Sequence, residues 1–322
     1  MKLFFYRRSD AQPNYGDELN LWLWDQVMPG ILDDDESTAF FGIGTLLNNL
    51  VKERAPNAKQ IVALGTGAGY NKGMPNVDET WKVYCLRGPL SALKLGLDPK
   101  LAITDGAALL HRIYKPSGVK RYKFSYIPHF TQSIMAGDDW QEICEELGIH
   151  YIDARRPIQE VIKEIAETEV LLAEAMHGAI TADTLRTPWI PVLTSQWILP
   201  SKWIDWTLSL NMEFQPHPIT GLDAIEKQYS LKNLKGVRGS RTIVRKAMAR
   251  WLKKEQAKLK LKQIMQQGVP QMSDDALFES KLCQLEEKVE EFKRDVASGL
   301  FASGEEKTER DQKADRETAL MA

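Results

Sequence analysis

Short runs of strand-forming residues alternate with segments of helical periodicity over about the first 210 residues of the chain. Strands that alternate with helices in this way predict parallel sheets covered by helices, the doubly wound α/β class. Pro89 suits a first helical position, Gly96 a helix end, and Asp17 the cap of the first helix. The expected strands are residues 2–6, 38–43, 60–64, 82–86, 101–104, 123–127, 149–152, 170–173 and 189–193; the expected helices include 46–50, 140–147, 158–166 and 201–208.

The strand–helix alternation restarts after a loop at residues 116–118. We therefore expect two sheet-and-helix domains, residues 1–117 and 118–231, with a cleft between them lined by strand ends. Such clefts are where two-domain α/β enzymes commonly bind their substrates.

One predicted strand-to-helix turn is the leading candidate for a functional site. The apolar run 170–173 is followed by Glu174, Met176, His177 and Gly178. Ligands of open α/β sheets bind at the carboxyl ends of strands, and a helix N-terminus there favours anionic groups. A histidine can exchange protons near neutral pH. The alternative is a core histidine followed by a helix-starting glycine.

Further polar side chains follow other predicted strands and converge on the same cleft. An arginine at a helix start can bind a carboxylate or phosphate with two hydrogen bonds, or it can pair with a neighbouring acid for structure alone. These residues are Asn14, Asp17, Arg87, Asp105 and His129.

A glycine-rich run at residues 65–69 follows the third predicted strand. It lacks the spacing of a dinucleotide fingerprint, and no glycine loop is followed by the Lys-Ser/Thr of a P-loop. Gly65 and Gly67 therefore either allow a ligand close to the backbone or form a tight turn. No His, Asp and Glu cluster has the spacing of a metal site.

The segment 232–270 is strongly basic. Residues 232–262 hold twelve Lys or Arg and one acid, which gives this segment a charge of +11. Because the whole chain has a net charge of −2, the rest of the chain carries −13. Apolar residues form one stripe on a helix whose other side is basic, which is typical of helices lying on anionic membranes and of helices packed on their own domain. The stripe is Ile243, Val244, Ala247, Met248, Trp251 and Leu252.

Residues 271–298 contain a heptad pattern, and residues 299–322 are charged and poor in apolar residues. The heptad offers a seam for a homodimer, although it is short for an independent coiled coil. We expect the tail to be disordered. The seam residues are Phe278, Leu282, Leu285, Val289, Phe292 and Val296.

No apolar run is long enough to span a membrane, and the three cysteines are far apart. We expect a cytoplasmic protein with reduced cysteines, Cys85 among them buried, peripheral attachment to the inner face of the cytoplasmic membrane, and no nucleic-acid partner.

An ordered set of motifs resembles the polysaccharide pyruvyl transferase family over about residues 1–210, and is most similar to members acting on succinoglycan-type exopolysaccharides. The most specific block runs from Glu174 to Ile180, with Ala182-Asp183 after it. The motifs are Asn14-Tyr15-Gly16-Asp17, Gly65-Thr66-Gly67, Leu86-Arg87-Gly88-Pro89-Leu90-Ser91, Thr104-Asp105-Gly106-Ala107-Ala108-Leu109-Leu110, Pro128-His129 and Met176-His177-Gly178-Ala179.

The resemblance implies a fold like glycosyltransferases of the B type, with two facing Rossmann-like domains and here a helical C-terminal extension. It implies transfer of the enolpyruvyl unit of phosphoenolpyruvate to a glycan or lipid-linked oligosaccharide, which forms a pyruvate ketal without a metal or organic cofactor. Residues matching Arg87 and the run Ala175-Met176-His177 are implicated in the family's donor binding and catalysis. The family has arginine where this chain has Ala175, so one anion contact must come from elsewhere, such as backbone N–H groups, Arg87 or Arg186.

In this scheme His177 is the general acid, and Glu174, Asp17 or His129 is the base. Two other functions stay open at this point: a nucleotide-sugar glycosyltransferase on the same architecture, and a non-catalytic, membrane-tethered assembly factor. The residues expected to bind substrate are Arg87, Asn14, Gly65, Gly67, Asp105, His129, Met176 and Gly178.

Overall fold

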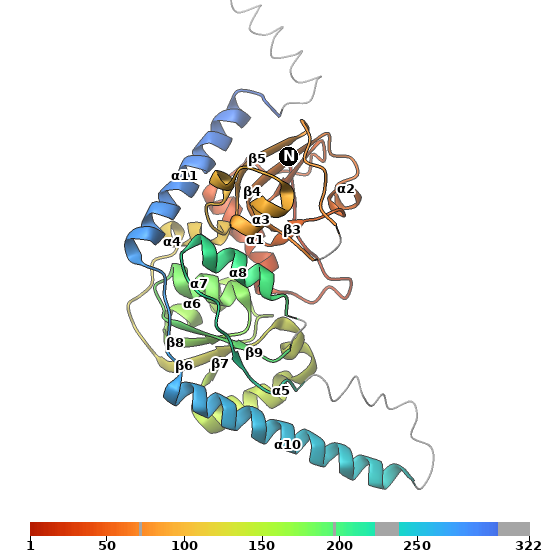
Figure 1. Ribbon diagram of the computed structural model, residues 1–322, viewed down its shortest axis with the longest axis vertical. Helices are drawn as coiled ribbons and strands as arrows, with labels where there is room; N and C mark the ends of the chain where they lie inside the picture. The colour runs from red at the N-terminus through yellow and green to blue at the C-terminus, as the bar shows by residue number, and fades with distance from the viewer. Residues whose placement is uncertain (71–72, 196–197, 223–237, 302–322) are drawn as a thin grey trace, which may run out of the picture.

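A computed structural model describes residues 1–70, 73–195, 198–222 and 238–301, with the backbone alone for 238–246. Its strands form two parallel five-stranded sheets, which confirms the predicted α/β class (Figure 1). The predicted domain boundary at 231–232 and residues 302–322 of the predicted tail lie outside the described residues. Among the described residues, no helix has the length and apolar character needed to cross a bilayer.

The first sheet has the order β1-β2-β4-β3, and β5 pairs with β4. The long strand β4 pairs with β2 along its first half and with β3 near its end. The strands are β1 (Lys2–Phe4), β2 (Thr38–Phe41), β3 (Thr45–Leu47), β4 (Gln60–Ala68) and β5 (Trp81–Leu86). The helices are α1 (Tyr15–Val27), α2 (Val51–Arg54), α3 (Pro89–Leu95), α4 (Leu110–Ile113) and the 3-10 turns η1 (Pro99–Leu101) and η2 (Gly106–Leu109).

The second sheet has the order β10-β9-β8-β6-β7, the flavodoxin-like order of doubly wound folds. The chain leaves β6 toward one edge of the sheet and leaves β8 toward the other, so the topological switch point lies between these two strands. The strands are β6 (Tyr122–Ile127), β7 (His150–Tyr151), β8 (Thr168–Ala173), β9 (Trp189–Leu193) and β10 (His217–Pro218). The helices are α5 (Phe130–Leu147), α6 (Ile158–Ala166), α7 (Met176–Thr184) and α8 (Pro200–Ser209).

Several local predictions for the first sheet are wrong. Residues 46 and 47 lie in strand β3 instead of a helix, the glycine run up to Ala68 continues strand β4, and residues 101–104 form no strand beyond one bridge from Ala102 to Leu86. Asp17 lies within the first turn of α1, whose N-cap is Asn14. At α3 the prediction is confirmed, because Pro89 begins the helix and Gly96 ends it in the left-handed conformation.

Helices α1 and α8 connect the two sheets. The backbone N–H of Tyr15 on α1 donates to the Ala154 carbonyl at 2.8 Å, and the Tyr15 hydroxyl shares a hydrogen bond of 2.6 Å with Thr181 on α7. Helix α8 follows β9 of the second sheet in the chain but contacts α3 and β4 of the first. Contacts made by α1 and α8 thereby fix the spacing between the carboxyl ends of the two sheets.

The heptad segment forms helix α11 (Asp275–Ala297), which lies along the first sheet (Figure 1). Its seam, apart from the partly buried Val296, is buried in the chain's own core. The Phe292 ring lies 5.5 Å from that of Phe40 and 5.4 Å from that of Tyr84. Apolar area that is already covered contributes nothing to a dimer. The seam predicted for a homodimer is therefore occupied within the chain.

The basic segment forms helix α10 (Arg238–Gln267), which packs on α5. Ala257, Leu261 and Ile264 are buried against the second sheet and its helix. The apolar stripe predicted from the sequence is not the face that packs on the protein, because Met248, Trp251 and Leu252 are exposed. The side chains of Ile243 and Val244 lie outside the described residues.

Candidate functional site

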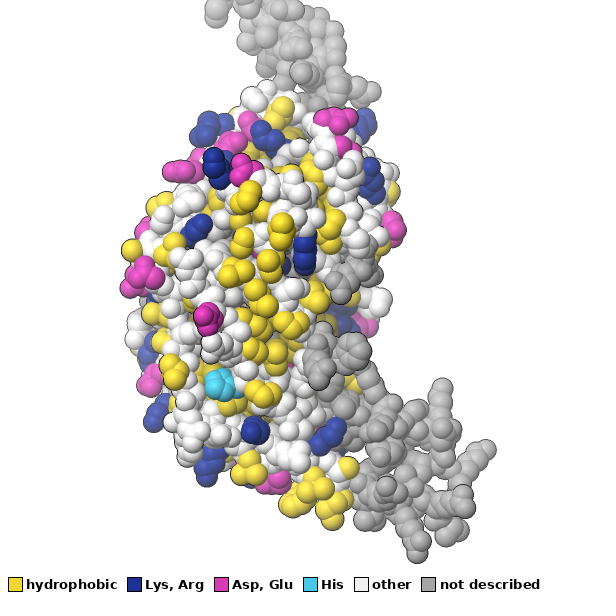
Figure 2. Space-filling view, in the orientation of Figure 1, with side chains coloured by type: hydrophobic (Ala, Val, Ile, Leu, Met, Phe, Trp, Pro, Cys, Tyr) yellow, Lys and Arg dark blue, Asp and Glu magenta, His cyan; other side chains and the backbone are white. Residues whose placement is uncertain are grey.

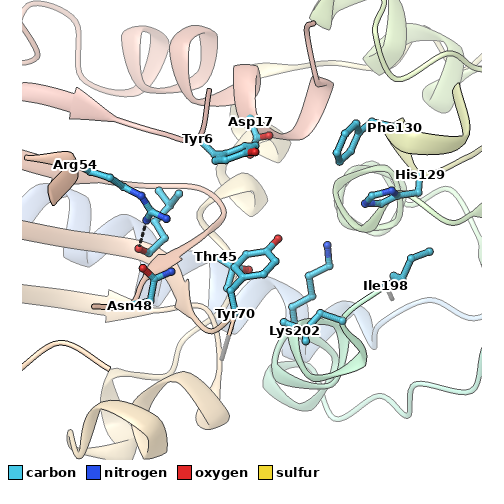
Figure 3. A pocket seen from close by; sticks show the side chains of 12 residues that line it. Tyr6, Asp17, Thr45, Asn48, Arg54, Tyr70, His129, Phe130, Ile198 and Lys202 are labelled. Carbon is cyan, nitrogen blue, oxygen red and sulfur yellow. Dashed lines mark hydrogen bonds between the residues drawn. The ribbon is translucent and has the colours of Figure 1, made fainter. Parts of the chain in front are cut away.

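A cavity of about 380 Å³ opens between the carboxyl ends of the two sheets (Figure 3). From the first sheet it is lined by Tyr6 after β1, Thr45 on β3 and Tyr70 after β4. From the second it is lined by His129 after β6 and Lys202 on α8. This is the edge of the second sheet where the switch point lies, as expected for a ligand site in this class.

The cavity continues into a narrow recess of about 80 Å³. Asp17, His129 and Lys202 line both spaces. The predicted strand-to-helix turn closes the recess, with Ala175, Met176 and His177 on its wall. The turn therefore lines a hollow at the strand ends, and its part in catalysis stays a prediction. The recess is lined by Asn14, Tyr15, Gly16, Asp17, Gly44, Thr45, Tyr70, His129, Phe130, Ala154, Ala175, Met176, His177 and Lys202.

A further cavity of about 340 Å³ lies beside the N-terminal loop. Its lining includes the rings of Phe5 and Tyr6 and the polar side chains of Gln12 and Asn14. Asp17 lines this cavity as well as the other two spaces. Asp17 is thus shared by the three hollows.

The Asp17 carboxylate is largely buried and has one strong partner. Asn14 Nδ2 donates to Asp17 Oδ2 at 2.6 Å. Burial raises the pKa of Asp17 to about 6, because desolvation disfavours its charged form more than the Asn14 hydrogen bond and the Lys202 charge favour it. A carboxyl with such a pKa can hold or release a proton near neutral pH.

Lys202 points into the cavity from the first turns of α8 (Figure 3). Burial and the nearby charge of Arg87 lower its pKa to about 8, whereas Asp17 acts in the opposite sense. Arg54 enters from the opposite side, and its Nη1 donates to the Leu46 carbonyl at 2.8 Å. Neither cation was predicted from the sequence. The only signal for Lys202 was its place within the helix expected at residues 201–208.

His177 stands in the first turn of α7 and packs on Gly16, where an added Cβ would lie 2.3 Å from its Nδ1. Its Nε2 is buried without a hydrogen bond, 3.8 Å from Asp105 Oδ2, which is also unpartnered. Burial, with Lys202 and Arg87 nearby, lowers the pKa of His177 to about 3. The ring is therefore neutral at pH 7, and its role as a general acid stays a prediction.

The second histidine of the cavity, His129, is also held neutral. Burial lowers its pKa to about 3, with the charges of Lys202 and Arg8 acting in the same direction. Its Nδ1 lies 2.9 Å from the Thr131 hydroxyl at the start of α5. The cavity thus combines cations, a carboxyl of raised pKa and neutral imidazoles.

Comparison with known proteins identifies a relative. The chain is 37% identical over 222 residues, 68% of each chain, to the succinoglycan biosynthesis protein ExoV of Rhizobium meliloti (strain 1021). It belongs to the polysaccharide pyruvyl transferase family. No family model and no solved structure matches the chain. The motifs that resembled those of the pyruvyl transferases can now be located around the cavity.

Arg87, expected to hold the donor, lies beneath the cavity wall. It is fully buried, and its Nε donates to Asp205 at 3.0 Å while Nη1 donates to Thr45, a lining residue, at 2.7 Å. Nη2 is buried without a hydrogen-bond partner. Arg87 does not line the described cavities, so it acts on them through Thr45 and through its charge.

Glu174, expected to act as a base, lies behind the wall and binds three strand ends together. It accepts hydrogen bonds from the backbone N–H of His129 at 2.9 Å and of Thr194 at 2.6 Å, and from the Tyr126 and Thr194 hydroxyls. Both of its oxygens are occupied, and it does not line the described cavities. Its geometry is that of a structural carboxylate.

The motif glycines approach the chain's own groups. Gly65 has φ +78°, and a Cβ there would lie 2.6 Å from the Gly106 backbone; a Cβ on Gly67 would lie 2.3 Å from the Arg87 guanidinium. Gly178 is close to Ile127. These positions require glycine for packing beneath the cavity. Asp105, expected at the site, is buried, caps η2 through the Ala107 N–H, and faces His177.

Among the described residues, no group of three or more His, Cys, Asp or Glu side chains is arranged to hold a metal ion. Burial raises the pKa of Asp105 to about 6, the same direction as for Asp17.

Proposed function

We propose that this protein transfers the enolpyruvyl unit of phosphoenolpyruvate to a sugar of a lipid-linked polysaccharide repeat, forming a pyruvate ketal and releasing phosphate. The observation that carries the proposal is the cavity at the strand ends, where Arg54 and Lys202 enter from opposite sides and Asp17 has a pKa of about 6. The relative is named a succinoglycan biosynthesis protein, which supports a role in exopolysaccharide synthesis.

The donor carries two anionic groups, a carboxylate and a phosphate. Lys202 and Arg54 provide a cation for each, and charge-assisted hydrogen bonds of this kind are the strong ones in proteins. Lys202 lines the same recess as Ala175, the position where the family has arginine. Lys202 thus replaces the missing anion contact from another element of the fold.

The reaction moves protons between the substrates. The methylene carbon gains one proton, two sugar hydroxyls lose two, and the departing phosphate takes the other, so the reaction balances without an external acid. Protonated Asp17 donates to the methylene carbon, and neutral His177 accepts from an attacking hydroxyl. The charge of Arg87 beneath the recess stabilises the developing phosphate anion.

The acceptor sugar occupies the cavity beside the N-terminal loop. The rings of Phe5 and Tyr6 offer apolar faces to a sugar, and Gln12 and Asn14 offer hydrogen bonds to its hydroxyls. Asp17 lies between this cavity and the donor cavity. The reacting carbon and hydroxyls would meet at that point.

Purified protein is tested with carbon-labelled phosphoenolpyruvate and oligosaccharide repeats of succinoglycan from which the pyruvate has been removed. The expected result is phosphate release coupled to a new ketal methyl signal in the NMR spectrum of the sugar. Nucleotide sugars are tested in parallel. Transfer from a nucleotide sugar would establish a glycosyltransferase instead, and binding of neither donor would support the non-catalytic assembly factor.

A further inference from the structure

Helix α10 carries apolar side chains on two opposite sides. Ala257, Leu261 and Ile264 are buried on α5 and the second sheet. The other side is exposed to an extent unusual for such residues: Met248 and Trp251 are 55% exposed, Leu252 47% and Leu259 65%. Their spacing of three, four and seven residues places them on one face of the helix. Packing on the protein thus accounts for only one of the two faces.

The basic residues of α10 also divide into two groups. Arg250, Lys254 and Lys258 form ion pairs with acids of α5, namely Asp139, Glu142 and Glu146. Lys253, Lys260 and Lys262 have no acidic partner among the described residues. The acid near the exposed face, Glu255, is 3.7 Å from Lys258. The exposed apolar residues are therefore bordered by unneutralised positive charge.

We propose that this exposed face of α10, defined by Met248, Trp251, Leu252 and Leu259, docks on the surface of an anionic lipid bilayer. Tryptophan, methionine and leucine can enter the interface, and lysines beside them attract anionic headgroups. A second copy would bring like charges together, which disfavours self-association through this face. The inference is independent of the reaction at the cavity.

The surroundings of α10 leave room for this contact. The helix runs along one end of the molecule, and its N-terminal part extends beyond α5 (Figure 1). Hydrophobic side chains gather at that end of the molecule in the space-filling view (Figure 2). A flat bilayer can therefore reach the face without displacing either sheet.

The test is co-sedimentation of the full-length chain with vesicles of phosphatidylcholine alone or mixed with phosphatidylglycerol. We expect binding to the anionic vesicles at low salt and release at high salt, because exposed charges are screened. Trp251→Ala combined with Leu252→Ala should lower the partition coefficient at least tenfold. The matched control is Leu93→Ala, an apolar residue of α3 that is 75% exposed, and it should change nothing.

The charge contribution is tested separately. Replacing Lys253, Lys260 and Lys262 by glutamine should weaken binding about fivefold per lysine. Glutamine at the exposed lysines Lys52, Lys59 and Lys115 is the control of equal net charge. The proposal is overturned if the chain stays in the supernatant at low salt, if neutral vesicles bind equally, or if both lysine sets have the same effect. Concentration-dependent dimerisation abolished by the Trp251 and Leu252 changes would show a protein partner instead.

Discussion

The wall of the cavity and the layer of side chains beneath it both contain charged groups, but their charges are balanced differently. In the buried layer, Arg87 pairs with Asp205, and Glu174 accepts hydrogen bonds at both oxygens. On the wall, Asp17 and Lys202 are half-buried with few partners, and their pKa values move toward neutral pH. The charged residues of the buried layer thus hold the shape, whereas the incompletely compensated residues on the wall are available for chemistry.

The comparison predicts its largest effect for the buried layer. Arg87→Met should lower the free energy of unfolding by about 3–5 kcal/mol, because it leaves the buried Asp205 charge without its partner. Denaturant unfolding measures the change. Lys293→Met, which removes an exposed pair with Glu290 on α11, should cost less than about 1 kcal/mol. A stable Arg87 variant whose only defect is donor binding would show that Arg87 contacts the donor instead of supporting the wall from beneath.

Substitutions on the wall should change catalytic activity more than stability. Asp17→Asn should lower kcat about a hundredfold because the acid is lost, with no loss of stability at pH 7. The pKa of Asp17 is raised on folding, so its ionisation opposes folding and stability falls as pH rises from about 4 to about 6. Asparagine removes that cost. Asp25→Asn on the exposed side of α1 is the control, and equal kcat in the two variants would remove Asp17 from the reaction.

Lys202 tests the donor side of the wall. Lys202→Gln should weaken phosphoenolpyruvate binding about tenfold to a hundredfold, the effect of losing a hydrogen bond to a charged group. Titration calorimetry of the donor alone measures it. The control Lys52→Gln on α2 changes the net charge by the same amount and should bind phosphoenolpyruvate normally. Unchanged donor affinity in Lys202→Gln would mean that the anion lies elsewhere.

The smallest effects are those of pH. As pH rises through about 6, Asp17 loses the proton it would donate, so kcat should fall; as pH rises through about 8, Lys202 loses its charge and donor affinity should fall. Rate and binding profiles of the wild type, Asp17→Asn and Lys202→Gln measure both. If the fall in kcat with rising pH persists in Asp17→Asn, the titration of another group causes it.

Much of the framework was predictable because its signals are local. Apolar periodicity located α6 and β9 to the residue, and Pro89 and Gly96 bounded α3. The turn at His177 was found because an apolar strand stops there and a helix begins. The glycine run misled the prediction, since Gly65 and Gly67 allow β4 to continue against Gly106 and Arg87, which are distant in sequence.

The sequence by itself determined the alternation of strands and helices, and with it the polar residues that collect at strand ends, because both follow from neighbours a few residues apart. Only the tertiary structure decided which of them face the cavity. Lys202 lines the same cavity as Asp17, far from it in sequence, because α8 returns from the second sheet to pack on the first. Burial then sets which groups titrate near neutral pH, since desolvation depends on what the folded chain packs around each charge.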